Sequence, residues 1–185
     1  MLRIASVYGG IAGFIVIASG LVIFAVQANR HLAGSEWLGY LVMILAFTLI
    51  FVGMKRYRDR DLGGVIRFLP AFGIGLLMAI FASVIYVVVW EVYVRFTGDA
   101  FINAYAATVV EKMQASGATA GAIAAKQAEL DQMIAAYANP LFRIPVTFSE
   151  IFPVGFIVAL ISALLLRNPR ILPARSATPN PGTAS

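Results

Sequence analysis

The sequence has no cysteine and a single histidine, His31. Without cysteine the chain can form neither disulfide bonds nor thiolate metal sites. With one imidazole, chemistry that depends on a set of histidines is nearly excluded as well. Charge is also scarce, because 12% of the 185 residues are charged whereas 61% are hydrophobic. This composition lies far to the apolar side of soluble domains and predicts a membrane protein.

Four long apolar runs account for this composition, at residues 4–26, 37–54, 68–90 and 151–166. As helices, the first and third extend roughly 34 Å and the fourth roughly 24 Å, against a hydrocarbon core of about 30 Å. The fourth run therefore needs residues 147–150 as its outer turn. The first run is too long for a signal-peptide core, which favours its retention as a membrane helix. The sequence predicts an all-α integral membrane protein with four transmembrane helices.

Basic residues are divided unequally between the two sides that four spans create. The N-terminus, the loop after the second span and the C-terminus share one side, which holds nine basic residues against five on the other. Because Lys and Arg near span ends resist translocation, the nine-residue side is predicted to be cytoplasmic. The nine are Arg3, Lys55, Arg56, Arg58, Arg60, Arg67, Arg167, Arg170 and Arg175; the five are Arg30, Arg95, Lys112, Lys126 and Arg143.

The loop after the second span begins with a dense run of charges. The spacing predicts helical ion pairs from Lys55 to Asp59 and from Arg58 to Asp61, with the helix ended by Gly63 and Gly64. This loop first serves as an orientation signal, and its basic side chains also suit contact with anionic lipid headgroups. A dedicated phosphate site is the alternative, although the loop lacks P-loop spacing. The headgroup candidates are Lys55, Arg56, Arg58 and Arg60.

Small residues recur at every fourth position in three of the predicted spans, a spacing that permits close helix contacts in lipid. Such a stripe can serve packing within one chain or form a homodimer seam. Three stripes in one chain favour packing of the four helices against one another. The stripes are Ala5, Gly9 and Gly13; Ala71, Gly75, Ala79 and Ser83; and Gly155, Ala159 and Ala163.

The middles of the four runs carry no charge, so the polar candidates lie near the ends. Glu91 adjoins the interfacial aromatics Trp90 and Tyr93 and is spaced for a helical ion pair with Arg95. If Glu91 is buried, it is the best available ligand for a proton or a cation. Glu150 ends a Thr-x-x-Glu sequence that predicts a capping box, in which it satisfies backbone donors at the start of the last helix.

Residues 97–146 form the longest segment between spans and are predicted to lie outside the membrane. Helical periodicity on both sides of residues 116–119 predicts a helical hairpin, ended by Asn139-Pro140. The hairpin can pack on itself, on the membrane surface or on a partner. Residues 1–167 thus form a membrane domain, and residues 168–185, which contain four prolines, are predicted to be a disordered cytoplasmic tail.

Several motifs stand in a characteristic order. Lys55-Arg56-Tyr57-Arg58-Asp59 precedes Gly63-Gly64, then come Tyr86 and Trp90, then Asn139-Pro140, and finally the Thr-Phe-Ser-Glu-Ile-Phe-Pro-Val-Gly motif at residues 147–155. In this order the chain resembles a bacterial membrane family catalogued as domain of unknown function 4199. The likeness covers nearly the whole chain except the tail. It implies a four-helix inner-membrane protein with a longer outer segment, and it implies no activity.

Three functions compete on this evidence. The first is a non-catalytic protein that associates with the bilayer, with anionic lipids, and with a membrane-protein partner or a second copy. The alternative is a small oligomeric transporter or channel that uses Glu91 and a fourth helix bent at Pro153. An enzyme is disfavoured, because one histidine and scattered acids supply neither a metal site nor an activated nucleophile. We therefore expect no catalytic, metal or cofactor-binding residues and no nucleic-acid partner.

Overall fold

The computed structural model describes residues 1–29 and 36–173, and within them the chain forms six helices and no strand. Four helices are long enough and apolar enough to cross a membrane, as predicted. The other two lie between the third and the fourth of these long helices. The helices are α1 (Leu2–Asn29), α2 (Glu36–Asp61), α3 (Phe68–Thr97), α4 (Ala100–Ala115), α5 (Ala120–Tyr137) and α6 (Pro140–Leu166).

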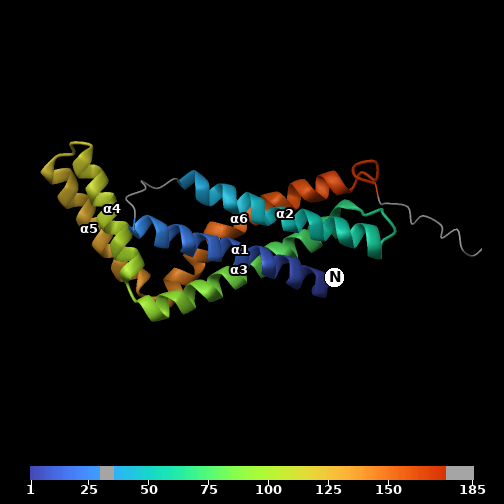
Figure 1. The fold of residues 1–185 in the computed structure, drawn as a ribbon, viewed down its shortest axis with the longest axis horizontal. Helices are drawn as coiled ribbons and strands as arrows, with labels where there is room; N and C mark the ends of the chain where they lie inside the picture. Colours follow the sequence, from blue (N-terminus) through green and yellow to red (C-terminus); the bar gives the residue numbers. More distant parts are fainter. Residues whose placement is uncertain (30–35, 174–185) are drawn as a thin grey trace, which may run out of the picture.

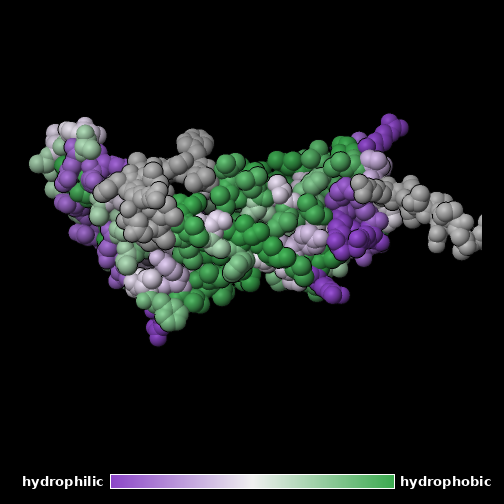
Figure 2. Space-filling view, viewed as in Figure 1, coloured by the Kyte–Doolittle hydropathy of each residue, from purple (hydrophilic) through white to green (hydrophobic). Residues whose placement is uncertain are grey.

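The four long helices run along the longest axis of the molecule, with α4 and α5 side by side at one end (Figure 1). The N-terminus, the α2–α3 connection and the end of α6 lie at the opposite end. We call this the inner end and the α4–α5 side the outer end, following the predicted orientation. Helix α3 makes its most extensive contacts with α6 and α1. On the face shown in Figure 2, apolar residues form a band between two hydrophilic ends.

Glycines allow the long helices to approach closely in the middle of the bundle. A Cβ atom at Gly13 would lie 2.9 Å from the carbonyl carbon of Ala82, and Gly9 faces the backbone of Met78 in the same way. A Cβ atom at Gly155 would lie 3.0 Å from that of Ala79. Each of these contacts joins two helices of the chain at the short distance that small residues permit.

The last turn of α2 ends at the two glycines that the sequence singled out. Gly63 and Gly64 have positive φ values of 66° and 93°, a region that residues with a Cβ atom rarely adopt. The Gly64 amide donates a hydrogen bond of 2.9 Å to the carbonyl oxygen of Arg58 and closes the helix. The predicted helix end is confirmed.

The predicted capping box at residues 147–150 is wrong, because α6 begins earlier, at Pro140. Asn139 is the N-cap, and its Oδ1 atom accepts a hydrogen bond of 3.0 Å from the Leu141 amide. Pro140 follows at the first helical position, where its missing N–H costs nothing. The backbone of Thr147 and Glu150 therefore lies within a continuing helix. Carbonyl oxygens one turn earlier accept hydrogen bonds from the backbone amides there, so no side-chain cap is needed.

Candidate functional site

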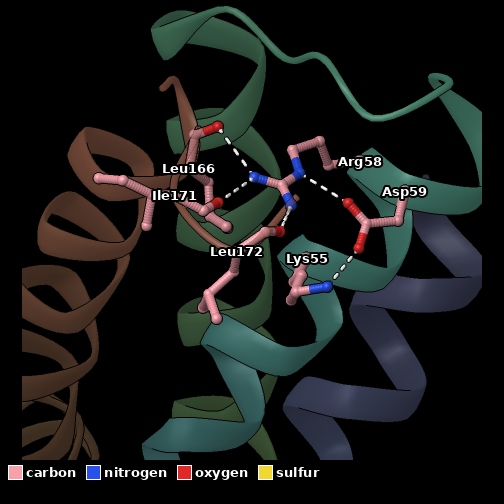
Figure 3. A network of polar contacts seen from close by, with 6 residues as sticks. All are labelled: Lys55, Arg58, Asp59, Leu166, Ile171 and Leu172. Carbon is pink, nitrogen blue, oxygen red and sulfur yellow. Dashed lines mark hydrogen bonds and ion pairs between the residues drawn. The ribbon is translucent and has the colours of Figure 1, made fainter. Parts of the chain in front are cut away.

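Arg58 forms the centre of a polar cluster at the inner end (Figure 3). Its side chain is fully buried, and its Nε atom donates to Oδ1 of Asp59 at 2.7 Å. The guanidinium also donates to three backbone carbonyls at and beyond the end of α6. Those carbonyls belong to Leu166, at 3.5 Å, to Ile171, at 3.1 Å, and to Leu172.

This arrangement makes Arg58 a side-chain cap for α6. The last carbonyls of a helix lack partners within the helix and carry partial negative charge, which a cation satisfies. The contacts also fasten residues 168–172 to α2, although the sequence predicted a disordered tail from residue 168. Residues 174–185 of the predicted tail lie outside the described part of the chain.

The structure confirms one predicted ion pair of this loop and corrects the other. Lys55 pairs with Asp59, as its spacing predicts. Arg58 pairs with Asp59 rather than with the exposed Asp61, because burial against α6 turns its guanidinium inward. With no exposed surface, Arg58 is removed from the headgroup candidates, whereas headgroup contact by Lys55, Arg56 and Arg60 stays a prediction.

A second polar cluster lies at the outer end, where α3 meets α6. Arg143 of α6 donates to both carboxylate oxygens of Glu91 of α3, at 2.7 and 2.6 Å. The same guanidinium donates to the carbonyl oxygen of Tyr137 at 3.0 Å and lies 5.7 Å from the centre of its ring. Arg143 is 7% exposed, so this forked ion pair is largely shielded from solvent.

The predicted ion pair between Glu91 and Arg95 is wrong. Arg95 is exposed on α3, and Arg143 takes both oxygens of Glu91. The helical spacing suggested a partner on the same helix, whereas a guanidinium from a neighbouring helix can approach with two parallel hydrogen bonds. Arg143 was counted only as an outer basic residue, and its place within an otherwise apolar stretch was the sequence signal for this role.

Glu91 is therefore engaged in a structural contact in this conformation. Any proton or cation that used Glu91 would have to compete with the Arg143 guanidinium. Glu150, the third residue of the predicted polar group, lies on an exposed face of α6. Within the described residues no ion pair joins Glu91, Arg95 and Glu150 to one another.

An aromatic group completes the outer cluster. The Trp90 Nε1 atom donates a hydrogen bond of 2.8 Å to the Tyr137 hydroxyl, which links α3 to the end of α5. The Trp90 ring also packs edge-on against Phe101, with ring centres 4.7 Å apart. Burial raises the pKa of the Tyr137 phenol, so the phenol stays neutral and its oxygen can accept the indole hydrogen.

A shallow groove of about 400 Å³ lies between α4 and α5. Alanine, valine, leucine and isoleucine side chains form its apolar part, and its charged lining is acidic. In the part of the chain that the structure describes, no group of three or more histidine, cysteine or acidic side chains is placed to hold a metal ion. The polar residues that line the groove are Asn103, Glu111, Gln114, Gln127 and Asp131.

A family model described as "Protein of unknown function (DUF4199)" matches residues 7–168. The chain belongs to the DUF4199 family. The match contains all four candidate spans, apart from the first residues of α1, together with α4 and α5. The proposed resemblance is thereby confirmed. No curated protein and no solved structure matches this DUF4199 chain.

Proposed function

We propose that this DUF4199 chain is a non-catalytic, multi-pass protein of the bacterial inner membrane that acts by association with lipid and protein partners. The observation that carries the proposal is the apolar band between two hydrophilic ends (Figure 2). A bilayer satisfies the outward-facing leucine, isoleucine, valine and phenylalanine side chains of this band, which water would not.

The charges of the two ends support the proposed orientation. Among residues 1–29 and 36–173, the inner end has eight basic and two acidic residues, and the outer end has four basic and seven acidic ones. The acids at the inner end include Asp59, whose charge is compensated by Lys55 and Arg58. Basic residues favour the cytoplasmic side, so both termini are proposed to be cytoplasmic and the 97–146 segment extracytoplasmic.

Anionic phospholipids are the proposed partners of the inner end. Its exposed arginines present a nearly uncompensated positive surface at the level where headgroups lie, and each contributes about 1 kcal/mol of attraction near an anionic surface. The exposed arginines of the inner end are Arg3, Arg56, Arg60, Arg67, Arg167 and Arg170.

The helices α4 and α5, proposed to form an extracytoplasmic hairpin, are the second association surface. Ile102 and Leu130 are their buried apolar residues, and most of their other side chains are exposed. A membrane-protein partner or a second copy of the chain can cover this surface. The non-catalytic proposal is supported by the two polar clusters, in which Asp59 and Glu91 are engaged by arginines of the same chain.

Cysteine labelling tests the proposed topology, because the natural chain contains no cysteine. A cysteine at Ser116 should react with an impermeant maleimide in intact spheroplasts, and a cysteine at Ser176 should react only after permeabilisation. The reverse pattern would refute the orientation, and labelling of neither position in permeabilised membranes would show that the reagent cannot reach them.

Association is tested by purification in mild detergent after crosslinking in the membrane. A stoichiometric protein partner, or a crosslinked dimer, is the expected result. Native mass spectrometry of the same preparation should detect bound anionic phospholipid, and the double variant Arg56→Gln/Arg60→Gln should retain less of it. The variant Arg95→Gln is the matched control, because Arg95 is exposed at the opposite end. A lipid-free monomer in both preparations would contradict the proposal.

A further inference from the structure

The groove between α4 and α5 combines an apolar floor with two carboxylates. Glu111 of α4 and Asp131 of α5 are its charged lining residues, and both are exposed. Neither carboxylate forms an ion pair or a hydrogen bond with another residue that the structure describes. The groove therefore offers hydrophobic contact together with negative charge that the described chain leaves uncompensated. Its aliphatic lining residues are Ala106, Ala107, Val110, Leu130 and Ile134.

The basic side chains of the two helices lie away from this groove. Lys112 and Lys126 are the only lysines or arginines in residues 100–137, and neither belongs to the groove lining. Lys126 pairs with Glu129 at 2.7 Å, and Glu129 also lies outside the lining. Two of the three acids of α4 and α5 thus line the groove, whereas both bases lie elsewhere. This segregation makes the electrostatic potential at the groove negative.

The shape of the groove suits a third helix. Helix α4 contributes residues 103, 106, 107, 110, 111 and 114 to the lining, and α5 contributes residues 127, 130, 131 and 134. Spacings of three and four positions keep these residues on one face of each helix, so two helix faces form the walls. A trough of this kind accepts the apolar side of an amphipathic helix. The pair stands at the outer end of the molecule (Figure 1), and no residue of the four long helices lines the groove within the described chain.

The charge of the groove decides among its possible occupants. In a two-fold symmetric dimer the same surface of each copy forms the interface, so Glu111 and Asp131 of both copies would meet with neither Lys112 nor Lys126 between them. Juxtaposed like charges oppose such an interface. An anionic membrane surface is repelled by the same two carboxylates. The occupant that complements the groove is therefore both apolar and cationic.

We propose that the groove between α4 and α5 is the docking site for a basic amphipathic helix of a partner protein outside the cytoplasm. Apolar side chains of that helix, one turn apart, pack on the aliphatic floor, and its lysine or arginine side chains pair with Glu111 and Asp131. This inference rests on the proposed extracytoplasmic association surface and names the chemistry of its partner.

The test uses the full chain in phosphatidylcholine nanodiscs, which carry no net lipid charge. The probe is a fluorescent peptide of about fifteen residues in which leucine and lysine alternate with helical periodicity, and its counterpart carries glutamate in place of lysine. Fluorescence anisotropy measures binding, and empty nanodiscs give the background from lipid. The leucine-lysine peptide should bind at least about tenfold more tightly than the leucine-glutamate peptide, and high salt should reduce this difference.

Charge variants test the two carboxylates. The double variant Glu111→Gln/Asp131→Asn should weaken binding of the leucine-lysine peptide about three- to tenfold, as the loss of two exposed ion pairs implies. The matched control is Asp99→Asn/Glu129→Gln, which also removes two carboxylates from this end of the chain but none from the groove lining. It should bind the peptide as wild type does. Equal affinity of the two double variants would overturn the proposal, because the peptide would then not recognise the groove.

A blocking variant tests the location independently of charge. Ala107 lines the groove and is exposed, so Ala107→Phe should fill part of the trough and weaken peptide binding more than about tenfold. Ala104→Phe is the matched control, since Ala104 is exposed on the same helix outside the lining. Undiminished binding in Ala107→Phe would refute the proposed location.

Two further outcomes separate this inference from the proposed function. A chain that does not incorporate into nanodiscs refutes the proposed membrane insertion, whereas an incorporated chain that binds neither peptide refutes only the present inference. Ala107→Cys tests the alternative occupant, a second copy. A disulfide-linked dimer of this variant in native membranes would show that two grooves meet and would overturn the proposal, and a monomer that binds the leucine-lysine peptide supports it.

Discussion

The middle of the helix bundle and its two ends are held together in different ways. In the middle, glycines bring α1 against α3 and α3 against α6, and the closest approaches of Gly13 and Gly155 are to the backbone of Ala82 and to the Cβ atom of Ala79. At each end, a buried arginine joins two helices through several hydrogen bonds. Lipid is as apolar as leucine, so close packing rather than hydrophobicity joins helices at membrane depth. Near the membrane interfaces, the desolvation cost of a charged side chain is lower than at the bilayer centre, so charged hydrogen bonds can fix the positions of helix ends.

The two arginines also differ from each other. Arg58 interacts mainly with backbone carbonyls and caps one particular helix end. Arg143 interacts mainly with a carboxylate on a neighbouring helix. Removal of Arg143 leaves a charge without compensation, whereas removal of Arg58 leaves mostly neutral carbonyls. The consequences of mutation should therefore differ in size.

The largest loss of stability is expected in the middle of the bundle. Gly13→Leu should destabilise the fold by roughly 3 kcal/mol or more, because the new side chain collides with the rigid backbone of Ala82 and must push α1 away from α3. Unfolding in mixed micelles with increasing SDS, followed by circular dichroism, measures this effect. Gly20→Leu is the control, since a Cβ atom at Gly20 has no neighbour within 4 Å among the atoms that the structure describes. Equal losses in both variants would show that the close contact with Ala82 does not explain the result, since leucine is a better helix former than glycine at both positions.

The next largest effect is expected at the outer end. Arg143→Ala should cost about 2–3 kcal/mol, which is below the usual range for a fully buried pair because Glu91 remains 24% exposed. The same SDS titration measures it. The double variant Glu91→Gln/Arg143→Ala should recover part of the loss, since it removes the uncompensated charge. Additive losses in that double-mutant cycle would contradict the ion pair, and Arg95→Ala should be close to wild type.

A smaller effect is expected at the inner end. Arg58→Ala should cost about 2 kcal/mol, because the α6 cap is lost and buried carbonyls are left without a donor. Arg58→Lys should recover less than half of that loss, since an ammonium cannot reproduce the planar fork that reaches several carbonyls. Hydrogen exchange of residues 163–172 should increase in both variants. Wild-type protection in Arg58→Lys would show that charge alone suffices.

The smallest effect concerns the one predicted ion pair that the structure confirms. Lys55→Ala should cost about 0.3–0.5 kcal/mol, as expected for a partly exposed pair at this helical spacing. Thermal unfolding at low salt measures it, and the difference from wild type should shrink at high salt because salt screens exposed pairs. A loss above about 1 kcal/mol would contradict this prediction and would show that Lys55, like Arg58, contributes more than an exposed ion pair does.

The sequence predicted much of the fold and little of the polar site. Four apolar runs, the end of α2 at Gly63 and the packing role of Gly13 and Gly155 all follow from local spacing. Two predicted partnerships failed because spacing along one helix cannot reveal a side chain on another. Arg143 replaced Arg95 as the partner of Glu91, and the carbonyls beyond α6 together with Asp59 replaced Asp61 as the partners of Arg58.

By itself, the sequence determined that the chain has four candidate membrane helices and an excess of basic residues on one side of them. These properties depend on hydropathy and charge along the chain, which no neighbour can alter. Only the tertiary structure decided where α6 begins, which acids meet the buried arginines, and that Glu150 faces outward. Those outcomes depend on which helices lie side by side and at what depth. A Thr-x-x-Glu sequence is compatible both with the start of a helix and with the interior of one. The burial of Arg143 and Thr147 against neighbouring helices accompanies the second arrangement, in which α6 continues through residue 147.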